Sequence, residues 1–234
     1  MIILAFDGTA KCASCAVLRD EVCLGEYNVD NGLTQSELLL PMAENLMKSL
    51  KLKFSEVDMY ATSVGPGSFT GVRIGAALVK GLAFGRDIPC ASVSTLDALA
   101  ENARGLSGII VPVMDARRAQ VYTAIFECDG NNMKKLTEDM AISIKDLGEM
   151  LRGYEGKQIY LVGDGYEVAR KGLIDSGIRV EVTPYGMRNE SAASVGRVAY
   201  HQYNEGKTVS DCELSPTYLR LPQAERERLE RMKK

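Results

Sequence analysis

The stretch GPGSFTGVRIG, residues 65–75, restricts the possible folds of this chain more than any other part of it. Before it, the apolar run DMYATSV predicts a short buried strand over 58–64. After it, apolar residues recur with helical spacing over 70–84, and Ser68 or Thr70 can cap that helix. The sequence therefore predicts a strand, a glycine loop and a helix.

Glycines mark both the loop and the helix. Gly65 and Gly67 permit a positive φ or the close approach of another group, and Pro66 stiffens the turn between them. Such a loop at a helix N-terminus can cradle an anion, but the Lys-Ser/Thr pair of a phosphate-binding P-loop is absent, so an ordinary tight turn is the alternative. In the helix, Gly71 and Gly75 cost about 1 kcal/mol each relative to alanine. This cost indicates close packing, either against the chain's own sheet or against a partner helix.

A second amphipathic helix is predicted over 33–51. Its apolar residues cover about half of the circumference, whereas a surface helix needs a stripe of about 100°. One edge can therefore pack on the sheet while another contacts a partner, although a well-buried helix has the same pattern. Pro41 lies in the first turn or kinks the helix. The candidate partner-interface residues on the two helices are Leu38, Leu39, Met42, Leu46, Gly71, Val72, Gly75, Leu78 and Leu82.

Two similar series of elements follow one another along the chain. The first has a helix after each of its last three strands, and its strands are predicted at 2–6, 14–18, 22–29, 58–64 and 88–93. The second has strands at 109–114, 120–127, 134–140, 159–162 and 180–182, and helices at 144–151, 166–176 and 191–203. This order predicts an α/β fold with two RNase-H-like halves, the second with trimmed helices. The predicted domains are 1–105 and 106–220, followed by a charged tail over 221–234.

Composition excludes several classes of protein. A chain of 234 residues with 46% hydrophobic and 25% charged residues is typical of a globular protein with one large or two small domains. The net charge of −3 argues against nucleic-acid binding by the chain alone, which usually leaves a basic footprint. There is no run of about 18 apolar residues, and the start MIILAFDG has no charged leader. We therefore expect a cytoplasmic protein that does not contact membranes.

Metal and redox chemistry have little support in the sequence. The six cysteines are too few for a disulfide scaffold and are expected to be reduced thiols. Cys12 and Cys15 form a C-x-x-C, but there is no second pair, and His201 is the single histidine. Because zinc needs four ligands, we expect no metal site. The sequence shows no recognisable nucleophile with a base and no carboxylate pair, so we expect no catalytic residue either.

The central stretch GPGSFTGVRIG resembles the signature of the TsaB family, also called YeaZ. The signature-loop residues are Gly65, Pro66, Gly67, Ser68, Thr70 and Arg73, of which Arg73 contacts either a partner or its own loop. Further resemblances to the family are ILAFD at the start, QSELLLPM at 35–42, PVMDARRAQVY at 112–122, GDGYE at 163–167 and PTYLR at 216–220. The resemblance implies an actin-like/Hsp70-like ATPase (ASKHA) fold.

The resemblance also implies a function. A member of this family is the non-catalytic partner of TsaD, which it would bind through the helices at about 34–50 and 70–84. Together with the ATPase TsaE, it would support formation of N6-threonylcarbamoyladenosine beside the anticodon of tRNAs that read codons starting with A. ATP and metal would bind to the partner proteins, the tRNA would be reached through the complex, and the isolated chain would form a homodimer.

Four residues form a possible vestigial nucleotide cleft. They follow strands at positions that resemble the phosphate and adenosine loops of the ASKHA superfamily, and they are Asp7, Asp115, Gly163 and Gly165. A phosphate loop needs glycine after its aspartate, but Ala116, Arg117 and Arg118 follow Asp115, so a standard ATP clamp is not expected. An ATP-dependent enzyme, kinase-like or peptidase-like, is the alternative function, and magnesium-dependent nucleotide binding would favour it.

Two further positions bear on function. Many family members have His-Ser-Glu where this chain has Gln35-Ser36-Glu37, which removes the last candidate imidazole. From Arg220 onward the chain holds six Arg or Lys against three Glu. We expect a solvated helix in this tail, and contact with tRNA phosphate is the alternative.

Overall fold

The computed structural model describes residues 1–220, so the predicted charged tail at 221–234 lies outside the described residues. The first half is built on a five-stranded sheet of order β3-β2-β1-β4-β5. Its strands are β1 (Ile2–Asp7), β2 (Ala13–Arg19), β3 (Val22–Val29), β4 (Met59–Ser63) and β5 (Cys90–Val93). β1, β2 and β3 form an antiparallel meander, and β4 and β5 run parallel to β1. The predicted strands of this half are confirmed, with small differences at their ends.

The second half repeats this arrangement. The strands β6 (Ser107–Asp115), β7 (Gln120–Thr123), β10 (Met140–Ser143), β11 (Ile159–Val162) and β12 (Glu181–Val182) have the order β10-β7-β6-β11-β12. β6 pairs antiparallel with β7 and parallel with β11, as β1 does with β2 and β4. A hairpin of β8 (Phe126–Asp129) and β9 (Met133–Lys135) is added beside β6.

The predictions of single strands over 120–127 and 134–140 are wrong. β7 pairs with the end of β6 and β8 with its beginning, so the chain is interrupted between them at 124–125. At the interruption, the Ile125 amide donates to Thr137 Oγ1 at 2.9 Å, and the Leu136 amide donates to the Ile125 carbonyl at 2.8 Å. The second predicted strand is divided in the same way into β9 and β10, because each pairs with a different neighbour.

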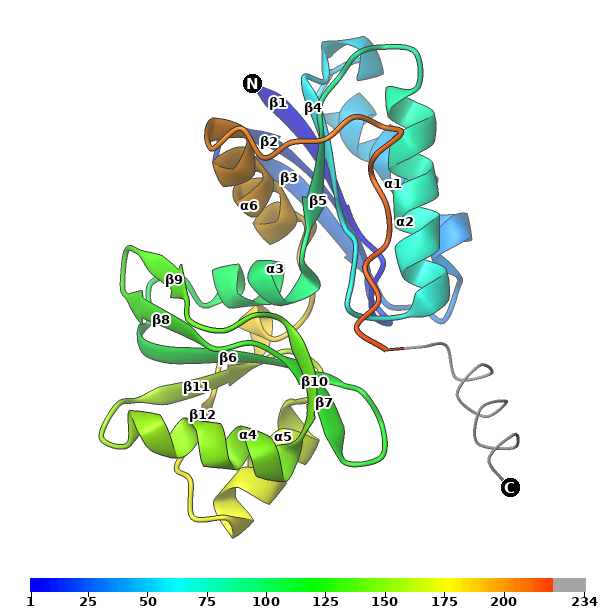
Figure 1. The fold of residues 1–234 in the computed structure, drawn as a ribbon. Coiled ribbons are helices and arrows are strands. Elements are labelled where there is room, and N and C mark those ends of the chain that lie inside the picture. Colours follow the sequence, from blue (N-terminus) through cyan, green and yellow to red (C-terminus); the bar gives the residue numbers. More distant parts are fainter. Residues whose placement is uncertain (221–234) are drawn as a thin grey trace.

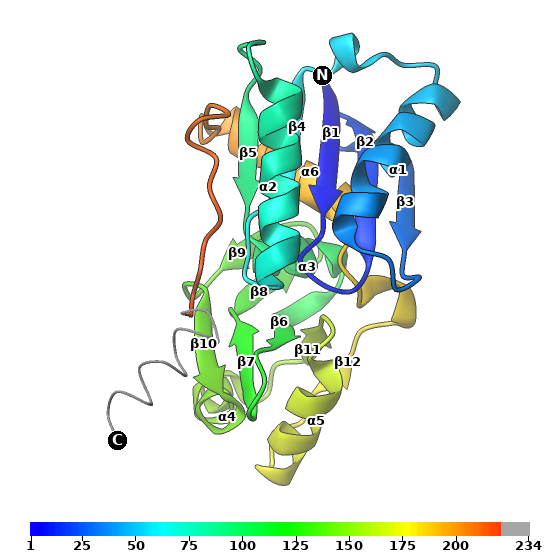
Figure 2. The same cartoon turned by 90° about the vertical axis from the view of Figure 1, so that its right-hand side faces the viewer.

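Each sheet carries two helices on its outer face. α1 (Gln35–Ser49) and α2 (Phe69–Ala83) pack on the first sheet beside one another (Figure 2), and α4 (Ile144–Leu151) and α5 (Tyr166–Asp175) pack on the second (Figure 1). Short 3-10 helices at Phe54–Glu56, Arg152–Tyr154 and Tyr185–Met187 complete the connections. α1 and α2 have 15 residues each, whereas α4 has 8 and α5 has 10, so the predicted trimming is confirmed for these pairs.

The third helix of each half packs on the sheet of the other half. α6 (Ala192–Asn204) follows the second sheet, yet its buried residues pack on the inner face of the first, where Ile3 and Ala5 point. α3 (Thr95–Asn102) follows the first sheet and packs chiefly on the inner face of the second, around Ile110. The predicted boundary at 105/106 therefore separates the two sheets but assigns α6 to the half that it does not cover. α6 has 13 residues and α3 has 8, so trimming does not extend to this pair.

The two halves thus share strand order, strand direction and the positions of their helices. An antiparallel meander followed by two parallel strands, with a helix after each of the last three strands, is the predicted RNase-H-like unit. Two such units, facing one another across α3 and α6, make up the predicted actin-like/Hsp70-like ATPase (ASKHA) fold (Figure 1). Within residues 1–220, no helix has both the length and the apolar character that a membrane span requires.

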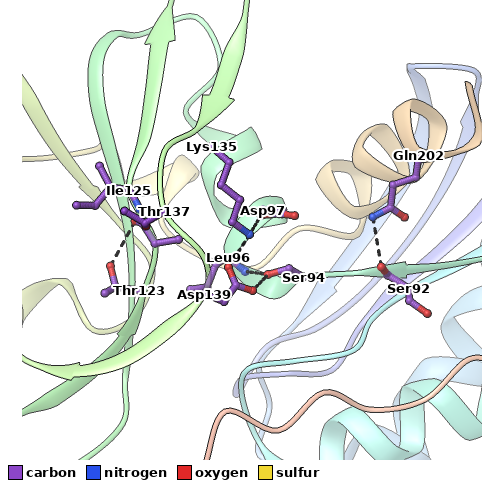
Figure 3. A network of polar contacts seen from close by, with 11 residues as sticks. Ser92, Ser94, Leu96, Asp97, Thr123, Ile125, Lys135, Thr137, Asp139 and Gln202 are labelled. Atoms are coloured by element: carbon purple, nitrogen blue, oxygen red, sulfur yellow. Dashed lines mark hydrogen bonds and ion pairs between the residues drawn. The ribbon is translucent and has the colours of Figure 1, made fainter. Parts of the chain in front are cut away.

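A polar network fixes the start of α3 to the added hairpin and the chain that follows it (Figure 3). Ser94 caps α3 by accepting from the Leu96 amide at 3.1 Å, and its hydroxyl donates to Asp139 Oδ2 at 2.5 Å. Lys135 Nζ lies 2.6 Å from a carboxylate oxygen of both Asp97 and Asp139. The helix that joins the two halves is therefore held at its first turn by residues of the second half.

Candidate functional site

The glycines of the signature loop are explained by contacts within the chain. A Cβ on Gly65, whose φ is +117°, would lie 2.5 Å from the Thr217 carbonyl oxygen. A Cβ on Gly67, whose φ is +155°, would lie 2.5 Å from the Thr9 carbonyl oxygen. The loop is thus enclosed between the turn that joins β1 to β2 and the segment around Thr217. Only glycine allows this conformation and this closeness together.

Ser68, rather than Thr70, caps α2. Its hydroxyl accepts from the Gly71 amide at 3.2 Å, and its own amide donates to the Thr9 carbonyl at 2.7 Å. Thr70 lies within the helix and is exposed. The cap therefore also joins the helix to the turn between β1 and β2.

The glycine stripe of α2 faces the chain's own sheet. A Cβ on Gly71 would lie 1.8 Å from the Gly8 carbonyl oxygen, and one on Gly75 would lie 2.7 Å from Thr62 Oγ1. Val72, between them, is also buried. Of the two explanations that the sequence left open, close packing on the home sheet accounts for both glycines.

All four predicted interface residues on α1 are buried within the chain. Leu38, Leu39, Met42 and Leu46 are at most 9% exposed and belong to the core beneath α1 and α2. Pro41 lies inside the helix rather than in its first turn, and it is exposed. On this helix, the apolar side chain that is open to a partner is Leu40, at 39% exposure.

The outward face of α2 carries residues that sequence reasoning missed. Ala77 and Gly81 are exposed, and a Cβ on Gly81 would have no neighbouring atom within 4 Å. Leu78 and Leu82, which were predicted, are half-buried beside them, and Phe84 at the end of the helix is 78% exposed. The i, i+4 spacing of Ala77 and Gly81 is a signal in the sequence. The prediction relied instead on Gly71 and Gly75, which lie on the opposite face of the helix. We call the surface formed by Ala77, Leu78, Gly81 and Leu82 the outer face of α2.

Residues 216–220, which we call the C-terminal strap, cross from the first half to the second (Figure 1). The Thr217 amide donates to the Val64 carbonyl at 2.7 Å, beside the signature loop. Farther along, Arg220 donates to the Ala116 carbonyl at 2.7 Å, in the turn that joins β6 to β7, and to Oε1 of Gln120, the first residue of β7. The strap therefore ties the loop before α2 to the second sheet.

Arg73 contacts its own chain. Its Nε donates to the Tyr218 hydroxyl at 2.8 Å, and its guanidinium carbon lies 5.6 Å from the centre of the Tyr218 ring. The same ring stacks on Phe69, with 4.8 Å between ring centres and 12° between ring planes. Within the chain, Arg73 therefore contacts the strap, and its contact with a partner stays a prediction.

Asp7 has its carboxylate oxygens fully engaged. One oxygen accepts from the Thr9 amide at 2.8 Å and the Thr9 hydroxyl at 2.7 Å, and the other accepts from Ser63 Oγ at 2.5 Å. The side chain is completely buried, and this burial raises the pKa of the carboxyl group. Asp7 therefore fastens the turn between β1 and β2 to β4.

The other three residues of the predicted nucleotide cleft lie together in the second half. Gly165 donates its amide to the Val113 carbonyl at 3.0 Å, and a Cβ on Gly163 would lie 2.3 Å from the same oxygen. Asp115 accepts from the Arg117 amide at 2.7 Å, and its own amide donates to Asp164 at 3.3 Å. The turn after Asp115 is left-handed at three successive residues, with φ of +63° at Arg117, +56° at Arg118 and +56° at Ala119.

Glu190 is a buried carboxyl group that the sequence did not indicate. It is 4% exposed, and burial together with the charges of Asp7 and Asp164 raises its pKa to about 8. Its pKa thus responds to Asp7 in the first half of the chain and to Asp164 in the second half. A glutamate in a polar loop gives no sequence signal of burial, because such residues are usually exposed.

Within residues 1–220, no group of three or more His, Cys, Asp or Glu side chains is arranged to hold a metal ion. The six cysteines are free thiols, and burial raises the pKa of Cys12 to about 11. His201 lies at the end of α6, with Nε2 3.0 Å from Glu21.

Comparisons of the sequence and of the fold find known proteins that are similar to this chain over most of its length. The family model described as "TsaD: tRNA N6-adenosine threonylcarbamoyltransferase" matches residues 34–227. The tRNA threonylcarbamoyladenosine biosynthesis protein TsaB of Bacillus subtilis (strain 168) is 30% identical, with full coverage of both chains. The protein of the same name from Escherichia coli (strain K12) is 29% identical and covers 94% of this chain and 95% of its own. A solved structure, YeaZ from Pseudomonas aeruginosa, has a TM-score of 0.78 at 23% identity, over 93% of this chain and 99% of its own, and so shares the fold.

Proposed function

The chain belongs to the TsaB (YeaZ) family, within the sequences that the TsaD family model describes, and we propose that it is an accessory subunit of TsaD. Membership connects it to threonylcarbamoyladenosine biosynthesis in tRNA. In the proposal, the chain binds TsaD and, together with TsaE, supports threonylcarbamoyl transfer to N6 of the adenosine 3′ to the anticodon. The substrate tRNAs read codons that start with A, and the complex works in the cytoplasm.

The observation that carries this proposal is the match with the TsaB protein of Bacillus subtilis. It spans both chains completely at 30% identity, so the relation covers both halves of the fold and not one motif. A shared fold alone would be a weak argument, because one fold hosts many functions.

The geometry of two turns, the one that joins β1 to β2 and the one that joins β6 to β7, supports a non-catalytic role. In the first half, the Thr9 amide donates to Asp7, and in the second half the Arg117 amide donates to Asp115. Each aspartate thereby accepts from the amide two residues ahead and closes a turn of the same kind with its own backbone. At equivalent places in both halves, one amide of the turn is therefore engaged within the chain.

The outer face of α2 is the surface that we propose for TsaD. Its exposed small residues, Ala77 and Gly81, allow another helix to approach the backbone closely, and Leu78 and Leu82 line the same surface. The exposed Phe84 adds an aromatic anchor of the kind that is enriched at protein interfaces. In the absence of TsaD, the same face would pair with a second copy of the chain.

Reconstitution tests the proposal. The purified chain, TsaD and TsaE are combined with unmodified tRNA, ATP and the threonylcarbamoyl donor, and the modified nucleoside is measured with each protein omitted in turn. We expect transfer only when this chain is present and none from this chain alone. Unchanged transfer after its omission would contradict the proposal, and ATP turnover by the isolated chain would favour an enzyme of the same superfamily instead.

A further inference from the structure

A cavity of about 500 Å³ lies between the two halves. Its wall combines Cys12 just before β2, part of β3, the end of α3, the segment over 185–191 and the first turns of α6. None of Asp7, Asp115, Gly163 and Gly165 lines it. Its size falls within the range of small-molecule sites, which often form where two units of a fold meet.

Most charged groups of this wall are already paired. Glu101 accepts from Arg104 at 2.6 Å and 2.7 Å, and Arg104 also donates to the Asn131 carbonyl at 2.6 Å. Glu26 accepts, through one oxygen, from Ser191 Oγ at 2.7 Å and from the Ala193 amide at 3.0 Å. These contacts hold the wall together and leave Arg104 little capacity to bind an anion.

Glu190, another charged residue of this wall, has an unpaired buried atom. Its side chain is 4% exposed, and its Oε1 has no hydrogen-bond partner among the described residues. A buried acceptor without a donor is destabilising by about 1–3 kcal/mol, so such an atom in a cavity wall indicates a place for a donor. The charges of Asp7 and Asp164 also act on Glu190, which makes this end of the cavity favourable for positive charge.

We propose that this cavity binds a small molecule with a primary ammonium group, which donates to Glu190. An ammonium has three donors and no acceptor, so it complements an unpaired carboxyl oxygen, and its positive charge would shift Glu190 from the protonated form that burial favours to the ionised form. Arg197 and Asn28, which also line the cavity, lie ready to contact a second polar group of the ligand. A diamine and a free amino acid both carry the required ammonium, and only the amino acid carries a carboxylate for Arg197. This inference does not depend on the proposed role with TsaD.

Isothermal titration of the full chain tests the inference, with putrescine and L-alanine as probes. We expect at least one of them to bind, and Glu190→Gln to weaken that binding about tenfold or more, since it removes a charge-assisted hydrogen bond. The control Glu181→Gln changes an exposed glutamate in β12 and should leave binding unchanged. Failure of both probes to bind at millimolar concentration, or full binding by Glu190→Gln, would overturn the inference.

Two further variants identify the ligand class and protect the test against misfolding. Arg197→Gln should weaken the binding of L-alanine but not that of putrescine if an amino acid is the ligand, and neither if a diamine is. Asn28→Trp alters the exposed rim of the cavity without touching Glu190, and it should obstruct either probe. If Glu190→Gln does not fold, unimpaired binding by Asn28→Trp would still place the ligand elsewhere and contradict the inference.

Discussion

The Nε atom of Arg73 donates a hydrogen bond of 2.8 Å to the hydroxyl of Tyr218, although the two residues lie 145 positions apart in the sequence. Because Tyr218 also stacks on Phe69, the first turn of α2 is covered by the C-terminal strap. The strap continues to Arg220, which contacts the turn between β6 and β7. The helix proposed to meet TsaD is therefore positioned by residues that connect it to the second half.

Substitutions of Tyr218 should separate its hydrogen bond from its stacking. Tyr218→Phe loses the bond to Arg73 and should lower the free energy of unfolding by about 0.5–1.5 kcal/mol. Tyr218→Ala also loses the stack on Phe69 and should cost about 1 kcal/mol more. Urea unfolding measures both, and Tyr203→Ala, at a side chain of similar exposure, is the control. Equal losses for Phe and Ala would show that the stack contributes nothing.

Two glycines of α2 should respond in opposite directions to alanine. Gly71→Ala places a Cβ against the Gly8 carbonyl and should destabilise the protein by about 1–3 kcal/mol. Gly81→Ala meets no neighbouring atom and should stabilise it by up to about 1 kcal/mol, through helix propensity. Thermal unfolding of both variants measures the difference. Destabilisation by Gly81→Ala would mean that this position is not open to solvent.

Ala77→Arg should weaken binding to TsaD about tenfold or more, because it places a long charged side chain on the outer face of α2. Val168→Arg, at an exposed position of α5, is the matched control and should bind normally. Surface plasmon resonance with immobilised TsaD measures both. Normal binding by Ala77→Arg would place the interface elsewhere.

Gly75→Leu is a poor probe of the interface, because its side chain would collide with Thr62 and destabilise the fold itself.

The stability of the protein should fall as pH rises through the range in which Glu190 titrates. Its pKa is raised from the ordinary value of 4.5 to about 8 in the folded chain. Between these values the folded state binds a proton that the unfolded state has lost, so the free energy of unfolding decreases with rising pH. Glu190→Gln should show a smaller decrease between about pH 5 and about pH 8. Urea midpoints of both proteins measure this, and equal slopes would contradict the burial of a protonated carboxyl group.

Local features of the fold were predictable from the sequence because local chemistry determines them. Glycine and proline marked the signature loop, and Ser191 marked the start of α6, which it caps by accepting from the Ser194 amide. The strands over 120–127 and 134–140 were mispredicted, because apolar pattern does not show where a strand changes its partner. The long strand β6 pairs with β8 near its beginning and with β7 near its end, and that property lies outside the mispredicted segments.

Site residues were harder to predict for a related reason. The stripe of Gly71 and Gly75 correctly indicated a close approach, but the pattern does not tell which neighbour approaches, and the neighbour is the chain's own first sheet. Asp7 was assigned to a possible vestigial nucleotide cleft, and its oxygens accept hydrogen bonds from Thr9 and Ser63. Glu190 carried no signal, because its burial depends on both halves coming together.

The exchange of the third helices has a consequence for synthesis of the chain. When translation has reached residue 105, the first sheet is complete, but Ile3, Ala5 and Leu18 on its inner face still lack the helix that covers them. That helix, α6, follows almost ninety residues later, and the second sheet in turn depends on α3, which precedes it. Neither half can bury the apolar inner face of its sheet alone, so we expect the nascent chain to reach its native state only near the end of translation. For the same reason, we expect the finished protein to unfold as one cooperative unit.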